Sequence, residues 1–351
     1  MTATTFAAAI RDALSVALER DPSVIVYGLG TTDPRGVFGT SLDLHRKFGE
    51  RRVFDMPTSE NAMTGVGIGA ALGGLRPVLT HQRLDFALLS LDQIVNNAAK
   101  WRFMFGGRRG VPITIRMIIG RGWGQGPTHS QSLQAWFAHI PGLKVVMPTS
   151  AEDAKGLLLA SIFDDDPVIF LEHRWLHNVT GDVPPGDYRT PIGKARLLRS
   201  GSDVTVVGMS LMTAEAVHAV DHLASQGITC DLIDLRTVRP IDWPMIEASV
   251  RRTGRLLALD TGYLTGGISA EIVAHIATAC WQQLRAPPRR LAMPDAPEAT
   301  SPALTRHYHV RAEHIARALA ELADRPAEWE SLGLSRTHPH DVPGDWFKGP
   351  F

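Results

Sequence analysis

Two side chains in this sequence are placed where they could carry out chemistry. Glu60 follows a Pro-containing turn in DMPTSENAMTGVGIGAALGG and stands at the start of a helix built from small residues. A carboxylate against such an apolar surface is costly unless it has a partner, so we expect a partner such as a ring nitrogen of a cofactor. His129 follows the glycine-rich loop GRGWGQG, and histidine can move protons near neutral pH.

Each feature also has a plainer interpretation. His129 could be a hydrogen-bonded structural histidine, as we expect for most of the 14 histidines, and His139 and His173 look like packing positions. GVGIGA formally matches a dinucleotide-binding fingerprint, but no strand precedes it and no acid follows at the expected distance. The sequence also lacks GxxxxGK[ST], HExxH and GxSxG, so no phosphate-loop, zinc-protease or serine-hydrolase signature competes with Glu60.

Strand and helix patterns alternate along most of the chain. Apolar spacing predicts a first helix over 4–20, capped by Thr4 or Thr5, and one long helix over 86–107. This alternation indicates α/β, doubly wound domains with parallel sheets. We predict two in tandem, with the following boundaries: a first domain over 1–178, a linker rich in Pro, Gly and Asp over 179–200, a second domain over 201–324 and an irregular tail over 325–351.

Composition excludes several classes of protein. Lys plus Arg and Asp plus Glu both number 36, so charge gives no reason to expect nucleic acid or a membrane surface as partner. Cys230 and Cys280 lie in apolar contexts, which predicts buried free thiols in a reducing compartment. We see neither a signal peptide nor an apolar run of the roughly 20 residues that span a bilayer. These features predict a cytoplasmic protein.

Several long motifs in the sequence resemble those of one family. They are TSENAMTGVGIGAALGGLRPV, DFALLSLDQIVNNAAKWRFMFGG, GPTHSQSLQAWFAHIPGLKVVMP, DAKGLLLASIFDDDPVIFLEH, DLIDLRTVRPID and TGGISAEI. Together they resemble the β subunit of thiamine diphosphate-dependent 2-oxoacid dehydrogenase E1 components, the pyruvate dehydrogenase E1 β and transketolase-like family. The resemblance covers nearly everything except the tail. It implies a transketolase-like pyrimidine-binding (PYR) domain followed by a transketolase C-terminal-like domain.

The resemblance assigns roles to particular residues. Glu60 matches the acid that hydrogen-bonds the aminopyrimidine N1′ of the cofactor, and Phe86 matches the aromatic residue that packs on that ring. His129 matches an active-site histidine that polarises the substrate or assists proton transfer. The family also implies a structural potassium ion bound by backbone carbonyls, at positions that match Ile113, Ser161, Ile162, Asp164 and Asp166.

A missing motif implies a partner. The superfamily binds diphosphate and Mg²⁺ through a GDG segment followed by an Asn pair, and this chain has no GDG. Mg²⁺ needs oxygen ligands beside the phosphates, so the resemblance implies that an α subunit supplies them in an α2β2 heterotetramer. The expected activity is decarboxylation of a 2-oxo acid, with the acyl group passed to a lipoyl domain of an acyltransferase.

Three departures from the family keep an alternative open. Leu29 stands where the family usually has an acidic pair. Arg83 stands where the family is apolar or acidic, and could contact an anionic substrate or form a surface ion pair with Asp85. Arg121 and Trp123 lie on the glycine-rich loop, and Arg121 is a second candidate substrate contact. The alternative is a split transketolase-like or acyloin-forming carboligase that transfers to an aldehyde or sugar; a scaffold without catalysis is a third possibility.

Overall fold

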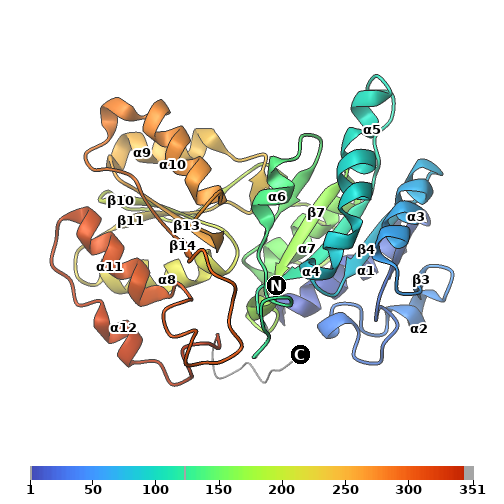
Figure 1. The fold of residues 1–351 in the computed structure, drawn as a ribbon, viewed down its shortest axis with the longest axis horizontal. Helices are drawn as coiled ribbons and strands as arrows, with labels where there is room; N and C mark the ends of the chain where they lie inside the picture. The colour runs from blue at the N-terminus through green and yellow to red at the C-terminus, as the bar shows by residue number, and fades with distance from the viewer. Residues whose placement is uncertain (1, 122–123, 344–351) are drawn as a thin grey trace. The chain divides into compact units, whose positions relative to one another are not determined.

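The computed structural model describes residues 2–121 and 124–343, which form two compact units (Figure 1). Of the described residues, unit 1 contains 2–120 and 128–192, and unit 2 contains 121, 124–127 and 193–343. The boundary near residue 192 falls inside the stretch that the sequence predicts as a linker. The grouping of Arg121 and residues 124–127 with unit 2 is a feature that no local pattern predicted.

Unit 1 is built on a parallel sheet. Its strands lie in the order β6-β7-β5-β4-β2-β3, and each neighbouring pair is parallel. Their side chains are almost all buried, as a sheet covered on both faces requires. The strands are β2 (Val24–Gly28), β3 (Val53–Asp55), β4 (Arg76–His81), β5 (Thr114–Ile119), β6 (Lys144–Val146) and β7 (Val168–His173). A separate antiparallel pair joins β1 (Thr2–Thr5) to β8 (Thr180–Val183).

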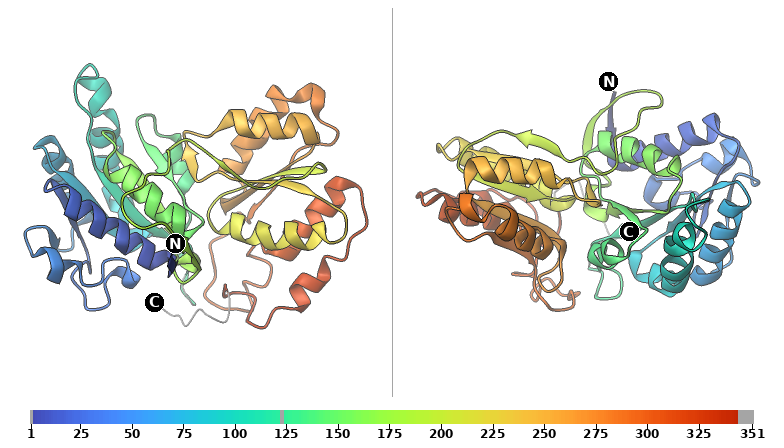
Figure 2. Two further views of the ribbon diagram at one scale, coloured as in Figure 1. Left: turned by 180° about the vertical axis from the view of Figure 1, so that it is seen from behind. Right: turned by 90° about the horizontal axis from the view of Figure 1, so that it is seen from above.

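Helices of unit 1 form two layers. Helix α1 packs on α7, and α3 packs with the helical segments between residues 84 and 104 (Figure 2). The helices are α1 (Phe6–Arg20), α2 (Leu44–Phe48), α3 (Glu60–Leu72), α4 (Leu84–Ala87), α5 (Ala99–Met104), α6 (Gln134–His139) and α7 (Ala151–Ile162), with short turns η1 (Val37–Gly39), η2 (Leu88–Ser90) and η4 (Arg174–Leu176) and the π-helix η3 (Gln93–Ala98).

Two helix predictions can be compared with these bounds. Helix α1 begins one residue after Thr5, whose side chain accepts a hydrogen bond from the backbone N–H of Ala8 at 3.2 Å, so Thr5 rather than Thr4 is the cap. The single helix predicted over 86–107 is wrong in detail, because α4, η2, η3 and α5 divide it and η3 is a π-helix. A π-segment accommodates an extra residue within a helix, which apolar spacing alone does not reveal.

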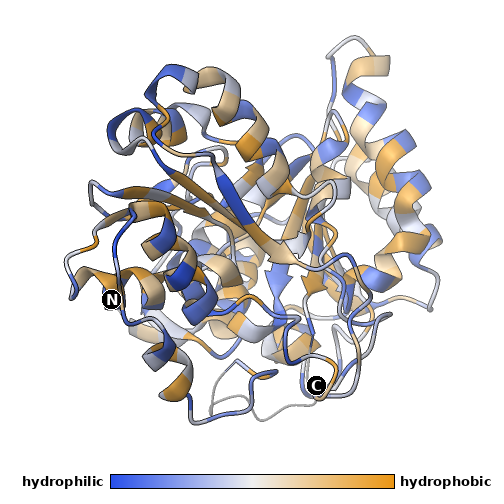
Figure 3. Cartoon of the chain, turned by 60° about the vertical axis from the view of Figure 1, so that its left-hand side comes forward, coloured by the Kyte–Doolittle hydropathy of each residue, from blue (hydrophilic) through white to orange (hydrophobic). Residues whose placement is uncertain are grey.

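Unit 2 has a five-stranded sheet in the order β14-β13-β10-β11-β9, in which only β9 is antiparallel. Its strands are coloured mainly as apolar (Figure 3). The elements are β9 (Arg196–Arg199), β10 (Val204–Gly208), α8 (Leu211–Ala224), β11 (Cys230–Asp234), β12 (Thr237–Arg239), α9 (Trp243–Thr253), β13 (Leu256–Tyr263), α10 (Ile268–Ala279), η5 (Trp281–Gln283), β14 (Arg289–Met293), α11 (Ala312–Ala323) and α12 (Glu330–Leu334). Cys230 and Cys280 are free and buried, as predicted.

The tail predicted as irregular contains the short helix α12 and is attached to unit 2. Arg336 donates to the carboxylate of Glu313 on α11 at 2.7 Å, and Arg311 donates to the carbonyl of Val342 at 3.1 Å. None of the helices within the described ranges is long and apolar enough to cross a membrane.

Candidate active site

The predicted site residues of unit 1 follow the carboxyl ends of its parallel strands. Strands β2, β3, β4, β5 and β7 end at Gly28, Asp55, His81, Ile119 and His173. Because the strands are parallel, these ends meet at one edge of the sheet, where open α/β sheets bind their ligands. Glu60 comes five residues after β3, Phe86 five after β4 and His129 ten after β5.

Glu60 is the first residue of α3 and is 8% exposed. Among the described residues, none donates a hydrogen bond to its carboxylate. A nearly buried acceptor without a donor is costly, so the position suits a ligand that brings its own N–H group.

Close packing fixes the helix that carries Glu60. Tyr27 on β2 donates its hydroxyl proton to the carbonyl of Met63 at 2.9 Å. A Cβ added at Gly67 would lie 2.1 Å from the Tyr27 Oη and 2.9 Å from the Cδ1 of Ile113. The small residues on this face of α3 therefore let the helix approach the sheet, and they hold the first turn at the sheet edge.

Phe86 and His129 are brought together. Their rings meet edge to face with centroids 5.2 Å apart. The loop that carries His129 is attached to α4 because Gln131 Nε2 donates to Asp85 Oδ1 at 2.8 Å. His129 is exposed, and its Nδ1 lies 3.1 Å from the hydroxyl oxygen of Thr128. The histidine is thus accessible, and Phe86 presents a half-buried ring beside it.

Arg83 is a buried structural contact in unit 1. It is 3% exposed, donates to the carbonyl of Gly120 at 2.7 Å and lies 5.6 Å from the ring centroid of Phe38. The prediction of a surface ion pair between Arg83 and Asp85 is therefore wrong, because the Arg83 side chain is buried. Gly120 itself has φ +71°, and an added Cβ would lie 2.3 Å from Nε2 of His173, so only glycine fits there.

Arg121 belongs to unit 2 and is buried between two carboxylates. Its Nε lies 3.1 Å from Glu298 Oε1, and its Nη2 lies 3.7 Å from Asp341 Oδ2. These partners already compensate the guanidinium charge. The role of Arg83 or Arg121 as a substrate contact stays a prediction, and Trp123 lies outside the described residues.

The predicted potassium positions lie near an arginine. Nη1 of Arg76 donates to the carbonyls of Ile162 and Asp164 at 3.3 and 2.9 Å. A potassium ion would share these two carbonyls with Arg76, so its binding also stays a prediction. The full set is Ile113, Ser161, Ile162, Asp164 and Asp166. Within the described ranges, no cluster of three or more His, Cys, Asp or Glu side chains is arranged to hold a metal ion.

Sequence reasoning missed a buried ionic cluster behind this edge. Arg116 on β5 pairs with Glu172 on β7 through bonds of 2.6 and 3.1 Å, and both side chains are fully buried. Nε2 of His177 lies 3.4 Å from Glu172. Burial alone would raise the pKa of Glu172, but the charge and hydrogen bonds of Arg116, together with the nearby His177, outweigh it, so the pKa is lowered. Burial lowers the pKa of His177.

The burial of His81 is a second feature that the sequence did not predict. It ends β4, is 1% exposed, and neither ring nitrogen has a hydrogen-bond partner among the described residues. Burial lowers its pKa to about 4, so the ring is neutral at pH 7. The only available signal was its place at the carboxyl end of an otherwise apolar strand.

Comparisons with known proteins identify the family. The description "Transketolase, pyrimidine binding domain" matches residues 2–179, and "Transketolase, C-terminal domain" matches residues 193–315. A "Pyruvate dehydrogenase E1 component subunit beta-1, mitochondrial" of Oryza sativa is 41% identical over 317 residues, which are 88% of this chain and 85% of the relative. The chain belongs to the E1 β-subunit family. Both the resemblance and the tandem α/β fold predicted from the sequence are confirmed.

Other E1 β-type relatives are similarly close. The "2-oxoisovalerate dehydrogenase subunit beta" of Bacillus subtilis is 40% identical, covering 90% of this chain and 97% of the relative. The "Acetoin:2,6-dichlorophenolindophenol oxidoreductase subunit beta" of Cupriavidus necator is 41% identical, covering 88% and 94%. Among solved structures, a "Split gene transketolase, inactive beta4 tetramer" has a TM-score of 0.72 over 91% of this chain and 98% of its own. At 21% identity, that structure supports the fold alone.

Proposed function

We propose that this E1 β-type chain, together with an α subunit, decarboxylates a 2-oxo acid on thiamine diphosphate and passes the acyl group to a lipoyl domain. The observation that carries the proposal is Glu60: a nearly buried carboxylate at the carboxyl edge of the sheet, with no donor among the described residues. The family's domain descriptions name a pyrimidine-binding domain over this part of the chain, and the N–H of a protonated pyrimidine ring nitrogen matches the donor that Glu60 lacks.

The residues of unit 1 fit the pyrimidine end of that cofactor. The cofactor supplies a carbon that can attack a ketone and hold the resulting negative charge. Glu60 binds and holds the proton on N1′, Phe86 packs its half-buried ring on the pyrimidine, and His129 lies within ring contact of Phe86. From its exposed position, His129 orients the substrate carbonyl or moves a proton to it.

The partner is an α-type subunit that contributes the diphosphate and Mg²⁺ ligands, because this sequence has no GDG segment. Support comes from exposed large apolar side chains on α3, η2, α5 and the residue that follows α5. Their exposed fractions lie between 51% and 89%, and they are Val66, Leu89, Phe103, Met104 and Phe105. Large exposed apolar side chains of this kind are what a partner subunit would cover. We propose the α2β2 heterotetramer as the assembly, and a cytoplasmic location for it.

The proposal names a class of substrate, the 2-oxo acids, and not a single compound. Relatives named for pyruvate, 2-oxoisovalerate and acetoin are 40–41% identical to this chain, so identity does not choose between them. The carboligase alternative draws on the three departures from the family together. Among them, Leu29 replaces an acid that could relay protons near the cofactor.

Co-expression with a GDG-containing α-type subunit tests the proposal. The assembled complex should release carbon dioxide from pyruvate or a branched 2-oxo acid and should reduce 2,6-dichlorophenolindophenol. It should also acylate an isolated lipoyl domain. Carbon dioxide release with no acylation of the lipoyl domain, but with acyloin formation when acetaldehyde is added, would favour the alternative. A complex that releases no carbon dioxide from pyruvate or a branched 2-oxo acid, and that transfers no ketol unit from a ketose phosphate to an aldehyde, would refute both functions.

A further inference from the structure

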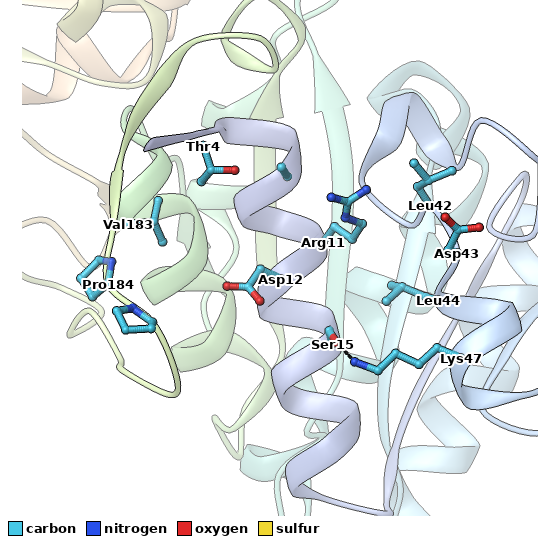
Figure 4. Close-up of a pocket in the computed structure, with 12 residues that line it drawn as sticks. Thr4, Arg11, Asp12, Ser15, Leu42, Asp43, Leu44, Lys47, Val183 and Pro184 are labelled. Carbon is cyan, nitrogen blue, oxygen red and sulfur yellow. Dashed lines mark hydrogen bonds between the residues drawn. The ribbon is translucent and has the colours of Figure 1, made fainter. Parts of the chain in front are cut away.

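Unit 1 also has a pocket, which shares no residue with the candidate active site. It is a pocket of about 590 Å³ between α1, the segment that leads into α2, and the chain that follows β8 (Figure 4). Its volume lies in the range of small-molecule sites. The lining residues are Thr4, Ala8, Arg11, Asp12, Ser15, Leu42, Asp43, Leu44, Lys47, Val183, Pro184 and Pro185.

One part of the lining is apolar. Leu42 and Leu44 lie on the α2 side of α1, and Val183 and Pro184 lie on its other side (Figure 4). Pro185 also lines the pocket. These side chains can cover a short hydrocarbon or an aromatic body from two sides, which removes apolar surface from water.

The acidic residues of the pocket already have cationic partners. Asp12 lies 2.7 Å from Nζ of Lys155, an ammonium that is itself fully buried, and Asp43 lies 3.2 Å from Nη1 of Arg46. Neither carboxylate therefore needs a cationic ligand.

The two cations of the pocket differ from each other. Lys47 pairs with Glu19 and donates to the hydroxyl of Ser15 at 2.9 Å. Arg11, in contrast, has no ion pair or hydrogen bond among the described residues, although it is partly buried. In Figure 4 its guanidinium extends from α1 toward the segment that carries Leu42. The uncompensated charge of the pocket is thus a single guanidinium, whose planar fork matches a carboxylate.

We propose that this pocket binds a small carboxylic acid with an apolar body. The carboxylate pairs with Arg11, and the body lies against Leu42, Leu44 and the Val183–Pro185 segment. A cationic or purely polar ligand would leave either the guanidinium or the apolar wall without a partner. The site lies apart from Glu60, Phe86 and His129, so such an acid can bind independently of the proposed catalysis.

Titration with hexanoate, hexylamine and hexan-1-ol tests the proposal on the full chain in its native assembly. Saturable binding of hexanoate, followed by calorimetry or ligand-observed NMR, is expected. The affinity for hexylamine and for hexan-1-ol should be roughly tenfold or more weaker, because neither can form a charge-assisted bond to Arg11.

Variants assign the binding to this pocket. Arg11→Gln should weaken hexanoate by roughly tenfold or more, whereas Arg51→Gln, at an exposed arginine outside the lining, should leave it unchanged. Leu42→Ser should weaken hexanoate but not acetate. Equal hexanoate affinity in Arg11→Gln and wild type, or hexylamine binding as tight as hexanoate, would overturn the proposal. Displacement of hexanoate by inorganic phosphate at equal concentration would do the same, since it would indicate a general anion site.

Discussion

Lowering the pH from 7 to 5 should destabilise unit 1 through His81. The ring has an ordinary pKa of about 6.5 when the chain is unfolded, and burial lowers it to about 4 in the fold. Between these values the unfolded state binds a proton that the native state does not, so the free energy of unfolding falls as the pH falls. From the two pKa values, the free energy of unfolding is about 2 kcal/mol lower at pH 5 than at pH 7.

The assay is urea unfolding at both pH values, with hydrogen exchange of peptides from β4 and β5 as the report on unit 1. His81→Leu should remove about 2 kcal/mol of the pH-dependent loss, whatever its effect on stability at pH 7. His139→Gln, at an exposed histidine that ends α6, is the control and should keep the full loss. His177 acts with the same sign, since its pKa is also lowered by burial, and accounts for part of what remains. Equal pH dependence in His81→Leu and wild type would refute the reasoning.

Three further changes should have measurable effects. Arg116→Met should cost about 3–5 kcal/mol in urea unfolding, because it leaves the buried Glu172 carboxylate uncompensated; adding Glu172→Leu should recover much of the loss, and no recovery would contradict the pairing. Gly67→Ala should cost about 1–3 kcal/mol through its clash with Tyr27, and Tyr27→Phe should relieve part of it; simple additivity of the two changes would exclude the contact. Potassium in place of tetramethylammonium should raise the melting temperature. At 100 times the dissociation constant of potassium, the free energy of unfolding should increase by about 3 kcal/mol; an unchanged melting temperature would exclude the cation site.

The fold was predictable because alternating strands and helices have few ways to pack. The apolar runs that became β4 and β5 and the small residues of α3 follow local rules, and the resemblance covered both domains. The placement of Phe86 beside His129 also follows, since both lie after neighbouring parallel strands and so come to one sheet edge.

The properties that could not be predicted depend on residues far apart in the sequence. Whether Arg83 is buried is decided by the carbonyl of Gly120 and the ring of Phe38. The partners of Arg121 are Glu298 and Asp341, which lie far along the chain in unit 2. A charged side chain that looks like a surface or substrate contact from its own segment can therefore be buried and paired by residues from distant segments.

The central claim is that Glu60 holds the N1′ proton of the pyrimidine ring, and exchange of the C2 proton of bound thiamine diphosphate tests it most directly. In the complex assembled with the α-type subunit, Glu60→Gln should slow that exchange by roughly 10²–10⁴-fold without changing assembly. Glu50→Gln, at an exposed carboxylate, should exchange at the wild-type rate. Exchange as fast in Glu60→Gln as in wild type, with the cofactor bound, would contradict the account.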